Sequence, residues 1–290
     1  MLSIPSGRRL SRMNNHAFAQ YLLNVDKIKA EDVEDLLRKS LKAEPGTAVI
    51  GIGKSLVSQQ ELGPLHADDG LDEAVRDILG DDADKISADK DDFTLKTAQA
   101  MLDEHMVSSS ELCDLFAMYD DEAERLNPFI KAVKSVAPED LEEVGAYGEY
   151  TRVFADAFSN YAHLPIVVMP DEFGGLARNT YFAVSQKVFG DLQIVGAIVA
   201  DENMCINIAH GYSQEPIDGV DSFTIDCMME FLNVVTGLLA VGYAKKDIDL
   251  ELGAPRWADS PLLHATNELP LTIATGCGTF GLVIAGDEPF

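Results

Sequence analysis

The chain has 290 residues, 47% of them apolar, which is enough for a sizeable core in one large domain or two ordinary ones. Asp and Glu number 49 against 22 Lys and Arg, so the formal charge at pH 7 is −27. Because nucleic acids and anionic membranes are bound through clustered cations, this balance excludes both as partners.

Targeting signals and cysteines indicate a cytoplasmic protein. The opening stretch MLSIPSGRRLSRMNN carries arginines but no apolar run behind them, so it does not predict a secretory signal. We find no apolar run of 18 residues and therefore expect no transmembrane helix. The 4 cysteines lie far apart without a CxxC pair, which is typical of reduced thiols in the cytosol.

The first part of the chain predicts helices. We expect residues 1–15 to form a flexible tail and residues 16–124 to form helix hairpins. The segments 19–37 and 98–116 share their apolar spacing, and a shorter echo lies at 56–65. Each copy predicts a helix, a turn with one inward apolar residue, and a second helix. Such hairpins cannot bury their apolar faces singly, so we expect them to pack on each other.

The second hairpin carries a start signal for its second helix. Ser108 or Ser109 is the expected N-cap, with Glu111 in the first turn. The sequence leaves two interpretations of the helical region open: a docking module for a partner, or a plain structural bundle.

Residues 125–290 predict an α+β domain in which helices pack on a mostly antiparallel sheet. Asn127 and Pro128 are expected to start a helix over 126–136, because Pro is favoured in the first helical turn. A second amphipathic helix is expected over 150–164. The alternating or continuous apolar runs that predict strands are 165–171 (ended by Pro170), 179–210 (several consecutive strands with turns at 189–191 and 201–203), 248–255, 268–276 and 278–286.

The segment from Phe223 to Leu239 predicts a buried helix with one narrow polar strip. At about 100° per residue, the strip is roughly 60° wide. Its members are Asp226, Glu230, Asn233 and Gly237. The apolar residues expected on the opposite, buried side are Met228, Phe231, Leu232, Val235 and Leu239. A solvated helix face would mix in Lys and Ser, so this strip predicts a presented surface.

Common catalytic and cofactor motifs are missing from the sequence. It contains no GxxxxGK[ST], GxSxG or HExxH motif, and no GxGxxG that follows a strand. The 6 histidines are scattered singly, and the carboxylates of Asp226 and Glu230 lack an accompanying His. We therefore expect neither a metal site nor a cofactor of the protein's own.

The strip resembles a known signature. The order D-x-x-x-E-x-x-N-x-x-x-G (226–237), followed by Pro255, is similar to the motif of the CheC/CheX/FliY chemotaxis phosphatase family. The stretch NPFIKAV (127–133) is similar to the opening of CheX proteins. A single copy of the motif favours the CheX-like branch, so the resemblance covers residues 125–290 and implies a CheX-like fold there.

The resemblance implies hydrolysis of the aspartyl phosphate on a CheY-like response regulator. Asn233 would orient the attacking water, and Glu230 would dock on the receiver's lysine. Asp226 would flank that contact, Gly237 would admit the partner's backbone, and Pro255 completes the signature. The receiver would supply Mg²⁺, so this chain needs no cofactor.

Two other functions remain open at this stage. A CheX-like domain can be a non-catalytic adaptor that binds a receiver or only self-associates, and the hairpins can form a small-molecule sensor. CheX-like proteins are dimers, and we expect a homodimer because the apolar strands after residue 180 leave room for pairing between sheets.

Overall fold

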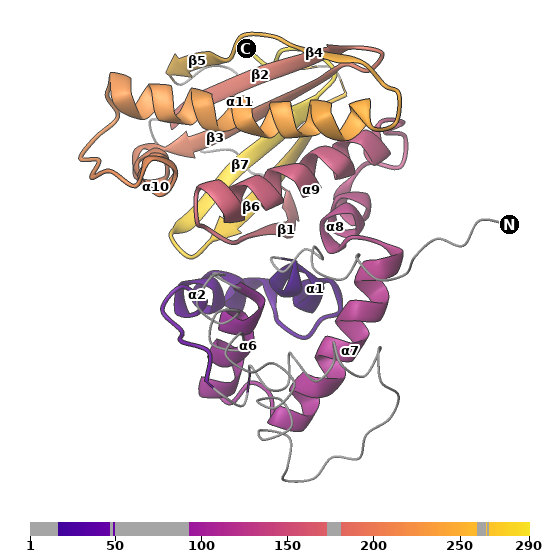
Figure 1. The fold of residues 1–290 in the computed structure, drawn as a ribbon, viewed down its shortest axis with the longest axis vertical. Helices are drawn as coiled ribbons and strands as arrows, with labels where there is room; N and C mark the ends of the chain where they lie inside the picture. Colours follow the sequence, from indigo (N-terminus) through magenta and orange to yellow (C-terminus); the bar gives the residue numbers. More distant parts are fainter. Residues whose placement is uncertain (1–16, 47–48, 50–92, 173–180, 260–264, 266) are drawn as a thin grey trace, which may run out of the picture.

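The structure is a computed structural model that describes residues 17–46, 49, 93–172, 181–259, 265 and 267–290. The tail 1–15 and the third hairpin echo at 56–65 lie outside the described residues. Figure 1 shows a sheet covered on one face by helices and, beyond one end of it, a second group of helices from the first part of the chain.

All the described strands join one antiparallel sheet in the order β1-β6-β7-β3-β2-β4, with β5 also paired to β2. The strands are β1 (Ile166–Glu172), β2 (Tyr181–Gly190), β3 (Ile194–Asp201), β4 (Leu250–Leu252), β5 (Arg256–Asp259), β6 (Leu269–Thr275) and β7 (Gly278–Ala285). The predicted α+β class is confirmed.

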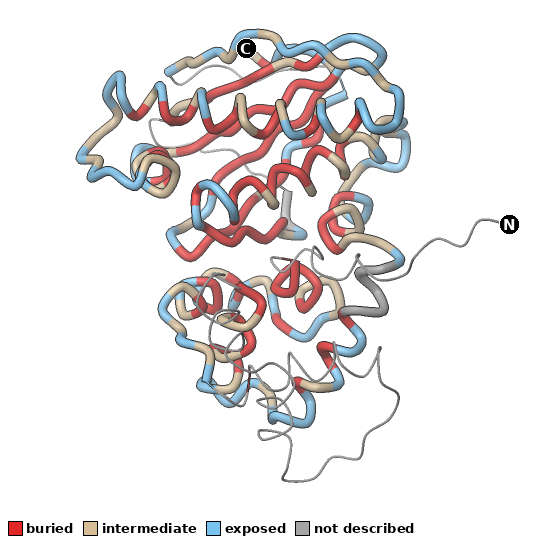
Figure 2. Tube along the Cα trace, in the orientation of Figure 1, coloured by how far each residue is buried: buried red, intermediate tan, exposed pale blue. Residues whose placement is uncertain are grey.

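The helices form two groups. Those of the first part are α1 (Phe18–Asn24), α2 (Ala30–Ser40), α6 (Phe93–Asp103) and α7 (Ser109–Arg125). Those that accompany the sheet are α8 (Pro128–Val136), α9 (Val144–Tyr161), α10 (Glu202–Ser213) and α11 (Ser222–Ala244). In Figure 1, α9 and α11 run across the same face of the sheet, and Figure 2 shows that the surfaces between them and the strands are buried.

Aromatic rings fill the layer between these two helices and the sheet. The rings of Phe158 and Phe231 meet edge to face with centroids 4.9 Å apart, and the Phe158 ring stacks on Phe280 of β7 at 5.2 Å. Phe154 lies beside all three. Aromatic burial of this extent stabilises strongly, so the layer fixes α11 on the sheet.

A close approach between α9 and β3 leads to a stability prediction. Tyr150 is fully buried, and its hydroxyl has no hydrogen-bond partner among the described residues. A methyl group at Gly196 would overlap this hydroxyl. We expect Gly196→Ala to lower the free energy of unfolding by about 1–3 kcal/mol, as overpacking does. Tyr150→Phe removes the nearest overlapping atom and an unpaired buried polar group, but the ring carbon Cζ, 2.1 Å from the added methyl, stays, so the double variant should regain only a small part of the loss.

Chemical denaturation of the single and double variants tests this pair. Gly242→Ala is the matched control, because a Cβ there meets nothing within 4 Å. That control should not lower stability. If Gly196→Ala unfolds at the wild-type denaturant concentration, the close packing is contradicted.

Two sequence expectations in this region are wrong. The sequence predicts a turn at 201–203 and a further strand to residue 210, but this stretch belongs to α10 (Glu202–Ser213). Asp201 ends β3 and caps the helix, because its Oδ1 accepts from the Met204 amide at 2.8 Å. The apolar residues then follow helical spacing, with Met204, Cys205 and Ile208 buried. Strand β1 also continues past Pro170 to Glu172, through a shift of register. The short strand β5 was not anticipated.

The first hairpin is built as predicted. Helices α1 and α2 are joined by a turn in which Ile28 is buried, with 3% of its surface exposed. In the second hairpin, the Ser108 hydroxyl and amide both donate to Glu111 at 2.8 Å, and the Glu111 amide donates back to the hydroxyl. This reciprocal capping box confirms Ser108 as the N-cap of α7, and these hydrogen bonds lower the pKa of Glu111.

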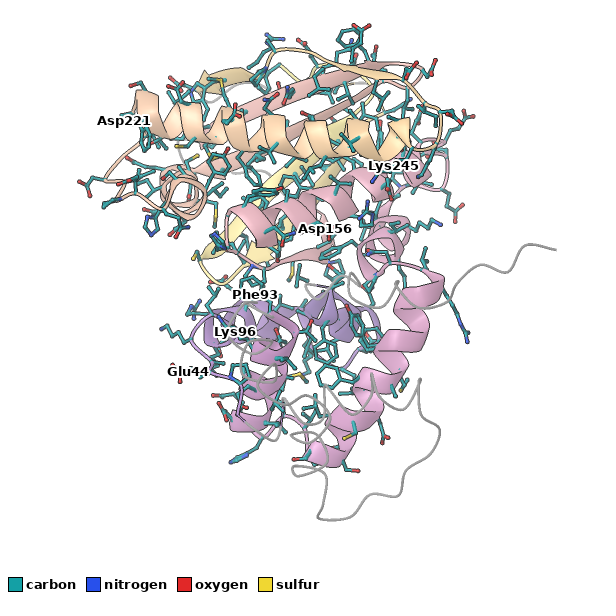
Figure 3. All side chains as sticks on the ribbon, viewed as in Figure 1. Glu44, Phe93, Lys96, Asp156, Asp221 and Lys245 are labelled. Atoms are coloured by element: carbon teal, nitrogen blue, oxygen red, sulfur yellow. The ribbon has the colours of Figure 1, made fainter. Side chains whose placement is uncertain are left out.

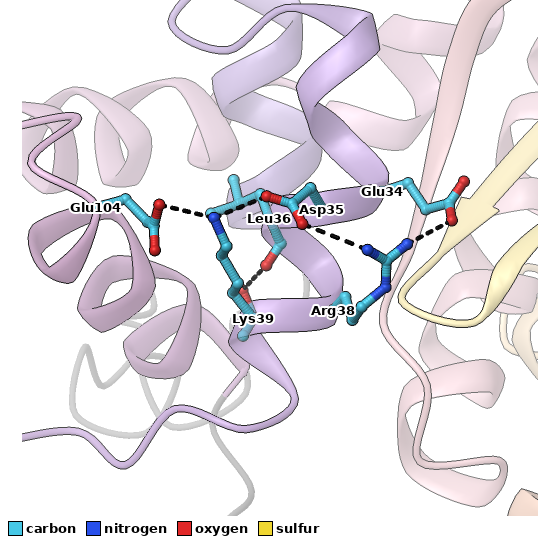
Figure 4. A network of polar contacts seen from close by, with 7 residues as sticks. Glu34, Asp35, Leu36, Arg38, Lys39 and Glu104 are labelled. Atoms are coloured by element: carbon cyan, nitrogen blue, oxygen red, sulfur yellow. Dashed lines mark hydrogen bonds and ion pairs between the residues drawn. The ribbon is translucent and has the colours of Figure 1, made fainter.

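An exposed ionic network joins the two hairpins (Figure 4). Lys39 of α2 bridges Asp35 and Glu104, with both N–O distances 2.7 Å, and Glu104 directly follows α6. Arg38 pairs with Glu34 and, more loosely, with Asp35. Because these side chains are exposed, solvent screens the attraction. The buried apolar residues of the hairpins therefore contribute more to holding them together.

The hairpins also contact the sheet directly. The fully buried side chain of Gln20 on α1 bonds both main-chain groups of Val168: its Nε2 donates to the carbonyl at 3.2 Å, and its Oε1 accepts from the amide at 2.7 Å. Asn24 Nδ2 donates to the carbonyl of Pro128 at 2.9 Å. Both parts of the chain share one buried apolar cluster. The boundaries 1–15, 16–124 and 125–290 stay a prediction.

Within the described residues, α11 is long and apolar enough to cross a membrane, by length and composition alone. The sequence analysis expected no transmembrane helix and did not identify α11 as a candidate. A core helix that packs on a sheet meets the same criteria, and α11 packs on β2 and α9.

Candidate functional site

Helix α11 begins at a strong cap and buries one broad face. The Asp221 carboxylate accepts from the Thr224 amide at 3.0 Å, which satisfies a free donor of the first turn. Met228, Phe231, Leu232, Val235 and Leu239 are each at most 1% exposed. These are the residues expected on the buried side, so the helical phase read from the sequence is confirmed.

The polar strip lies on the opposite, outward side. Asp226 and Glu230 are exposed, whereas Asn233 and Gly237 are half-buried. Glu230 and Asn233 are three residues apart, so their side chains are neighbours on the helix surface. No ion pair of Asp226 or Glu230 occurs within the described part of the chain. Glu230 is therefore a carboxylate that a partner's cation can reach.

The side chain of Asn233 is hydrogen-bonded to Gln186 of strand β2, on the core side of α11. The Gln186 Nε2 donates to Asn233 Oδ1 at 2.9 Å, and it also donates to the main-chain carbonyl of Gly253 at 2.8 Å. The Gln186 Oε1 accepts from the Thr236 hydroxyl at 2.8 Å. Gln186 is 2% exposed and Thr236 is fully buried. The amide of Asn233 is thus fixed from the core while its other edge faces outward.

Pro255 joins the site through the same glutamine. Gly253 lies between β4 and β5, two residues before Pro255, and its amide donates to the carbonyl of Lys187 at 2.8 Å. Because Gln186 bonds both Asn233 and Gly253, it ties the segment that leads into Pro255 to the strip. The structure therefore places four of the five predicted site residues on α11, and Gln186 links one of them, Asn233, to the segment that leads into the fifth, Pro255.

The surface around the strip is open and partly apolar. A Cβ placed at Gly237 would meet nothing within 4 Å, so the chain's own packing does not require a glycine there. Phe223, Leu238 and Val241 on the same helix are 48%, 38% and 57% exposed. Figure 3 shows the helix running along the outside of the molecule between the labelled Asp221 and Lys245. An acid and an amide therefore lie between exposed apolar side chains on this helix.

The negative charge of Glu230 acts on one partly buried neighbour, Tyr212. Burial raises the pKa of Tyr212, and the negative charge of Glu230 raises it further. The Tyr212 ring packs edge to face on Phe231, with centroids 5.9 Å apart. The site combines a negative surface with an apolar floor, which suits a partner group that carries positive charge.

No group of three or more His, Cys, Asp or Glu side chains within the described residues could hold a metal ion. The carboxylate of Glu230 and the amide of Asn233 can form ion pairs and hydrogen bonds and can orient a water molecule.

The sequence analysis missed Gln186. A signal was present, because Gln186 stands between Val184 and Val188 on the strand face that is directed at the core. A polar residue at an inward position needs a partner. Its partners lie on α11 and beside Pro255, which no local pattern reveals.

No family model matches the chain, and no curated protein matches it. A comparison with solved structures does find similar folds. The CheX–CheY–BeF3–Mg²⁺ complex from Borrelia burgdorferi aligns at 14% identity and a TM-score of 0.41, over 49% of this chain and 97% of that one. CheX from Vibrio vulnificus aligns at 14% identity and a TM-score of 0.39, over 47% and 93%. FliY from Thermotoga maritima aligns at 15% identity and a TM-score of 0.39, over 52% and 92%. These are structures of the family that the strip resembles.

Proposed function

We propose that this protein is a phosphatase that hydrolyses the aspartyl phosphate of a CheY-like response regulator. One observation carries the proposal: Glu230 and Asn233 lie side by side on the outward face of α11, the acid without an ion-pair partner among the described residues and the amide anchored from the core. The apolar face of that helix packs on the sheet and on α9, which leaves the strip on the outward side available to a partner.

Hydrolysis of an aspartyl phosphate requires few catalytic groups from the helix that binds the receiver. Phosphoryl transfer depends on an in-line nucleophile and on neutralising charge at the phosphoryl oxygens, with little covalent assistance. A receiver domain brings its own Mg²⁺, its lysine and the phosphorylated aspartate. The phosphatase has to position the water and exclude other geometries, which an anchored amide can do.

The two side chains divide this work. Asn233 is neutral, so it can approach phosphoryl oxygens without repulsion and hold a water molecule by a hydrogen bond. Glu230 is an exposed carboxylate, and an ion pair with the receiver's lysine would set the register of the helix in the pocket. Asp226 lies one turn before Glu230 and flanks this contact.

Gly237 and Pro255 shape the approach. The open space at Gly237 leaves room for the partner's backbone. Pro255 follows the Gly253 carbonyl that Gln186 holds, so it limits how the adjoining segment can move. Neither residue takes part in a chemical step.

We also propose that the protein acts in the cytoplasm as a homodimer, without a cofactor of its own. The similar CheX from Borrelia burgdorferi is described in a complex with CheY. A CheY-like receiver is therefore the partner class to test first. Light scattering at micromolar concentration tests the dimer, and a monomer there would contradict it.

The function is tested with a CheY-like receiver that has been phosphorylated by acetyl phosphate. Adding the purified protein should speed the loss of the receiver's phosphate, measured by tryptophan fluorescence or phosphate release. If the phosphorylated receiver decays at its own rate and yet binds, the protein is a non-catalytic adaptor. If it neither decays faster nor binds, the proposed partner class is wrong.

Glu230→Ala should weaken docking more than chemistry. Loss of one exposed ion pair is expected to raise KM for the phosphorylated receiver, and the effect should shrink at high salt because screening already weakens the pair. Glu139→Ala is the matched control, an exposed acid in the turn after α8. Equal KM values for Glu230→Ala and Glu139→Ala would contradict the docking role.

A further inference from the structure

We infer that Gln186 is a positioning residue that decides which atom of the Asn233 amide faces the partner. The inference rests on the proposed phosphatase function and adds to it. Gln186 is 47 residues from Asn233 in the chain and does not reach the surface, because it is 2% exposed. It would act only through the residue that touches the phosphoryl group.

The main chain fixes the orientation of the glutamine. The carbonyl of Gly253 can only accept a hydrogen bond, so the atom of Gln186 that meets it at 2.8 Å has to be the Nε2 donor. The Gln186 oxygen then faces the Thr236 hydroxyl at 2.8 Å. Both hydrogens of Nε2 and one lone pair of Oε1 are therefore in use.

The glutamine in turn fixes the asparagine. Its second Nε2 hydrogen is directed at Asn233, so the atom of Asn233 at 2.9 Å has to be the acceptor Oδ1. The Asn233 Nδ2 makes no hydrogen bond within the described part of the chain, and it lies on the outward edge of the amide. The helix thus presents a donor to its partner, which suits electron-rich phosphoryl oxygens and a water molecule held against them.

Burial makes this arrangement stiff. A polar group in the interior is costly to leave without a partner, so the Gln186 amide is not free to turn over. The same three contacts join β2, α11 and the segment that leads into Pro255. A change in that segment would be transmitted to Asn233 through Gln186, which gives the distant proline of the signature a physical connection to the reacting amide.

Gln186→Met tests the inference, since methionine keeps the length and apolar volume but bonds none of the three partners. We expect kcat for phosphate loss to fall on the order of 10²-fold, the scale of a misplaced catalytic group, while KM stays near wild type because Glu230 still docks. Ser185→Ala is the control: Ser185 is buried on the neighbouring position of β2, and its hydroxyl has no hydrogen-bond partner among the described residues. Wild-type kcat in Gln186→Met would overturn the inference.

A measurement on the protein alone, without a receiver, tests the orientation of Gln186 independently of the proposed phosphatase function. In nitrogen-15 NMR spectra, both Nε2 hydrogens of Gln186 should exchange slowly with water in the wild type. One of them should become fast in Asn233→Ala. Fast exchange of both in the wild type would refute the orientation, whatever the enzyme does. Slow exchange in a protein that does not speed phosphate loss would refute the function and leave the orientation intact.

Discussion

Asn233→Ala is expected to reduce the acceleration of aspartyl phosphate hydrolysis on the order of 10²–10³-fold, as the loss of one well-placed donor does. The substitution removes the outward Nδ2 and leaves Glu230 to dock. The kcat of the variant should therefore fall while its affinity for the phosphorylated receiver changes little. Single-turnover decay of the charged receiver at saturating phosphatase measures this directly, because it separates the chemical step from binding.

Asn160→Ala is the matched control for this prediction, since Asn160 is an exposed asparagine near the end of α9 and not on the helix that carries the strip. It should keep wild-type kcat. Asn233→Asp is a second test of the amide. It should also slow hydrolysis, because a carboxylate of the same size would repel the phosphoryl oxygens. If either Asn233 variant turns over like the wild type, the amide has no part in the reaction.

Phe231→Ala is expected to lower the free energy of unfolding by about 3–5 kcal/mol, the usual cost of emptying an aromatic site in a core. Phe231 is fully buried on the side of α11 opposite the strip. Its ring contacts Phe154 and Phe158 of α9 and Tyr212 of α10, so the cavity would open among side chains from two neighbouring helices. Urea denaturation followed by circular dichroism gives the value.

Val241→Ala on the same helix is the control for Phe231→Ala. Val241 is 57% exposed, so its truncation should change stability by less than about 0.5 kcal/mol. A loss below about 1 kcal/mol in Phe231→Ala would contradict the view that α11 is anchored by its aromatic face. In that case the strip would not be held rigidly enough to position a water molecule.

Much of the fold could be predicted because the signals are local. The phase of α11 follows from the spacing of its apolar residues, and the start of α8 follows from Asn127, whose side chain accepts from the Phe129 amide at 2.9 Å. The capping box of α7 is contained within four residues. Strands β6 and β7 are apolar runs separated by a glycine-containing turn, which the structure keeps as a tight hairpin.

The prediction of other elements was wrong where one local signal could indicate either a strand or a helix. The run from Met204 to Ala209 is apolar enough for a strand, and Asp201 with Glu202 resembles a turn. The same two acids also suit the first turn of a helix, where the exposed amides attract negative charge. Capping by Asp201 and burial against β3 favour the helix, and the sequence alone does not weigh those tertiary contacts.

In the candidate site too, the features set by local spacing could be predicted and those set by tertiary packing could not. Asp226, Glu230, Asn233 and Gly237 share one helix, so their common face could be predicted from spacing. Their roles in a reaction stay predictions. The support beneath Asn233 could not be foreseen, because β2 and the segment before Pro255 meet it only after the sheet and α11 have packed together.

The Gln20 side chain has a consequence for assembly. By bonding both main-chain groups of Val168, it fills one position on the outer edge of β1 with the hydrogen bonds that a residue of another strand would make. An unpaired edge invites a further strand from a neighbouring molecule, and a sheet with two such edges can grow without limit. At this position α1 takes the place of a further strand, so a neighbouring molecule cannot form regular ladder hydrogen bonds with β1 there unless the Gln20 side chain is displaced.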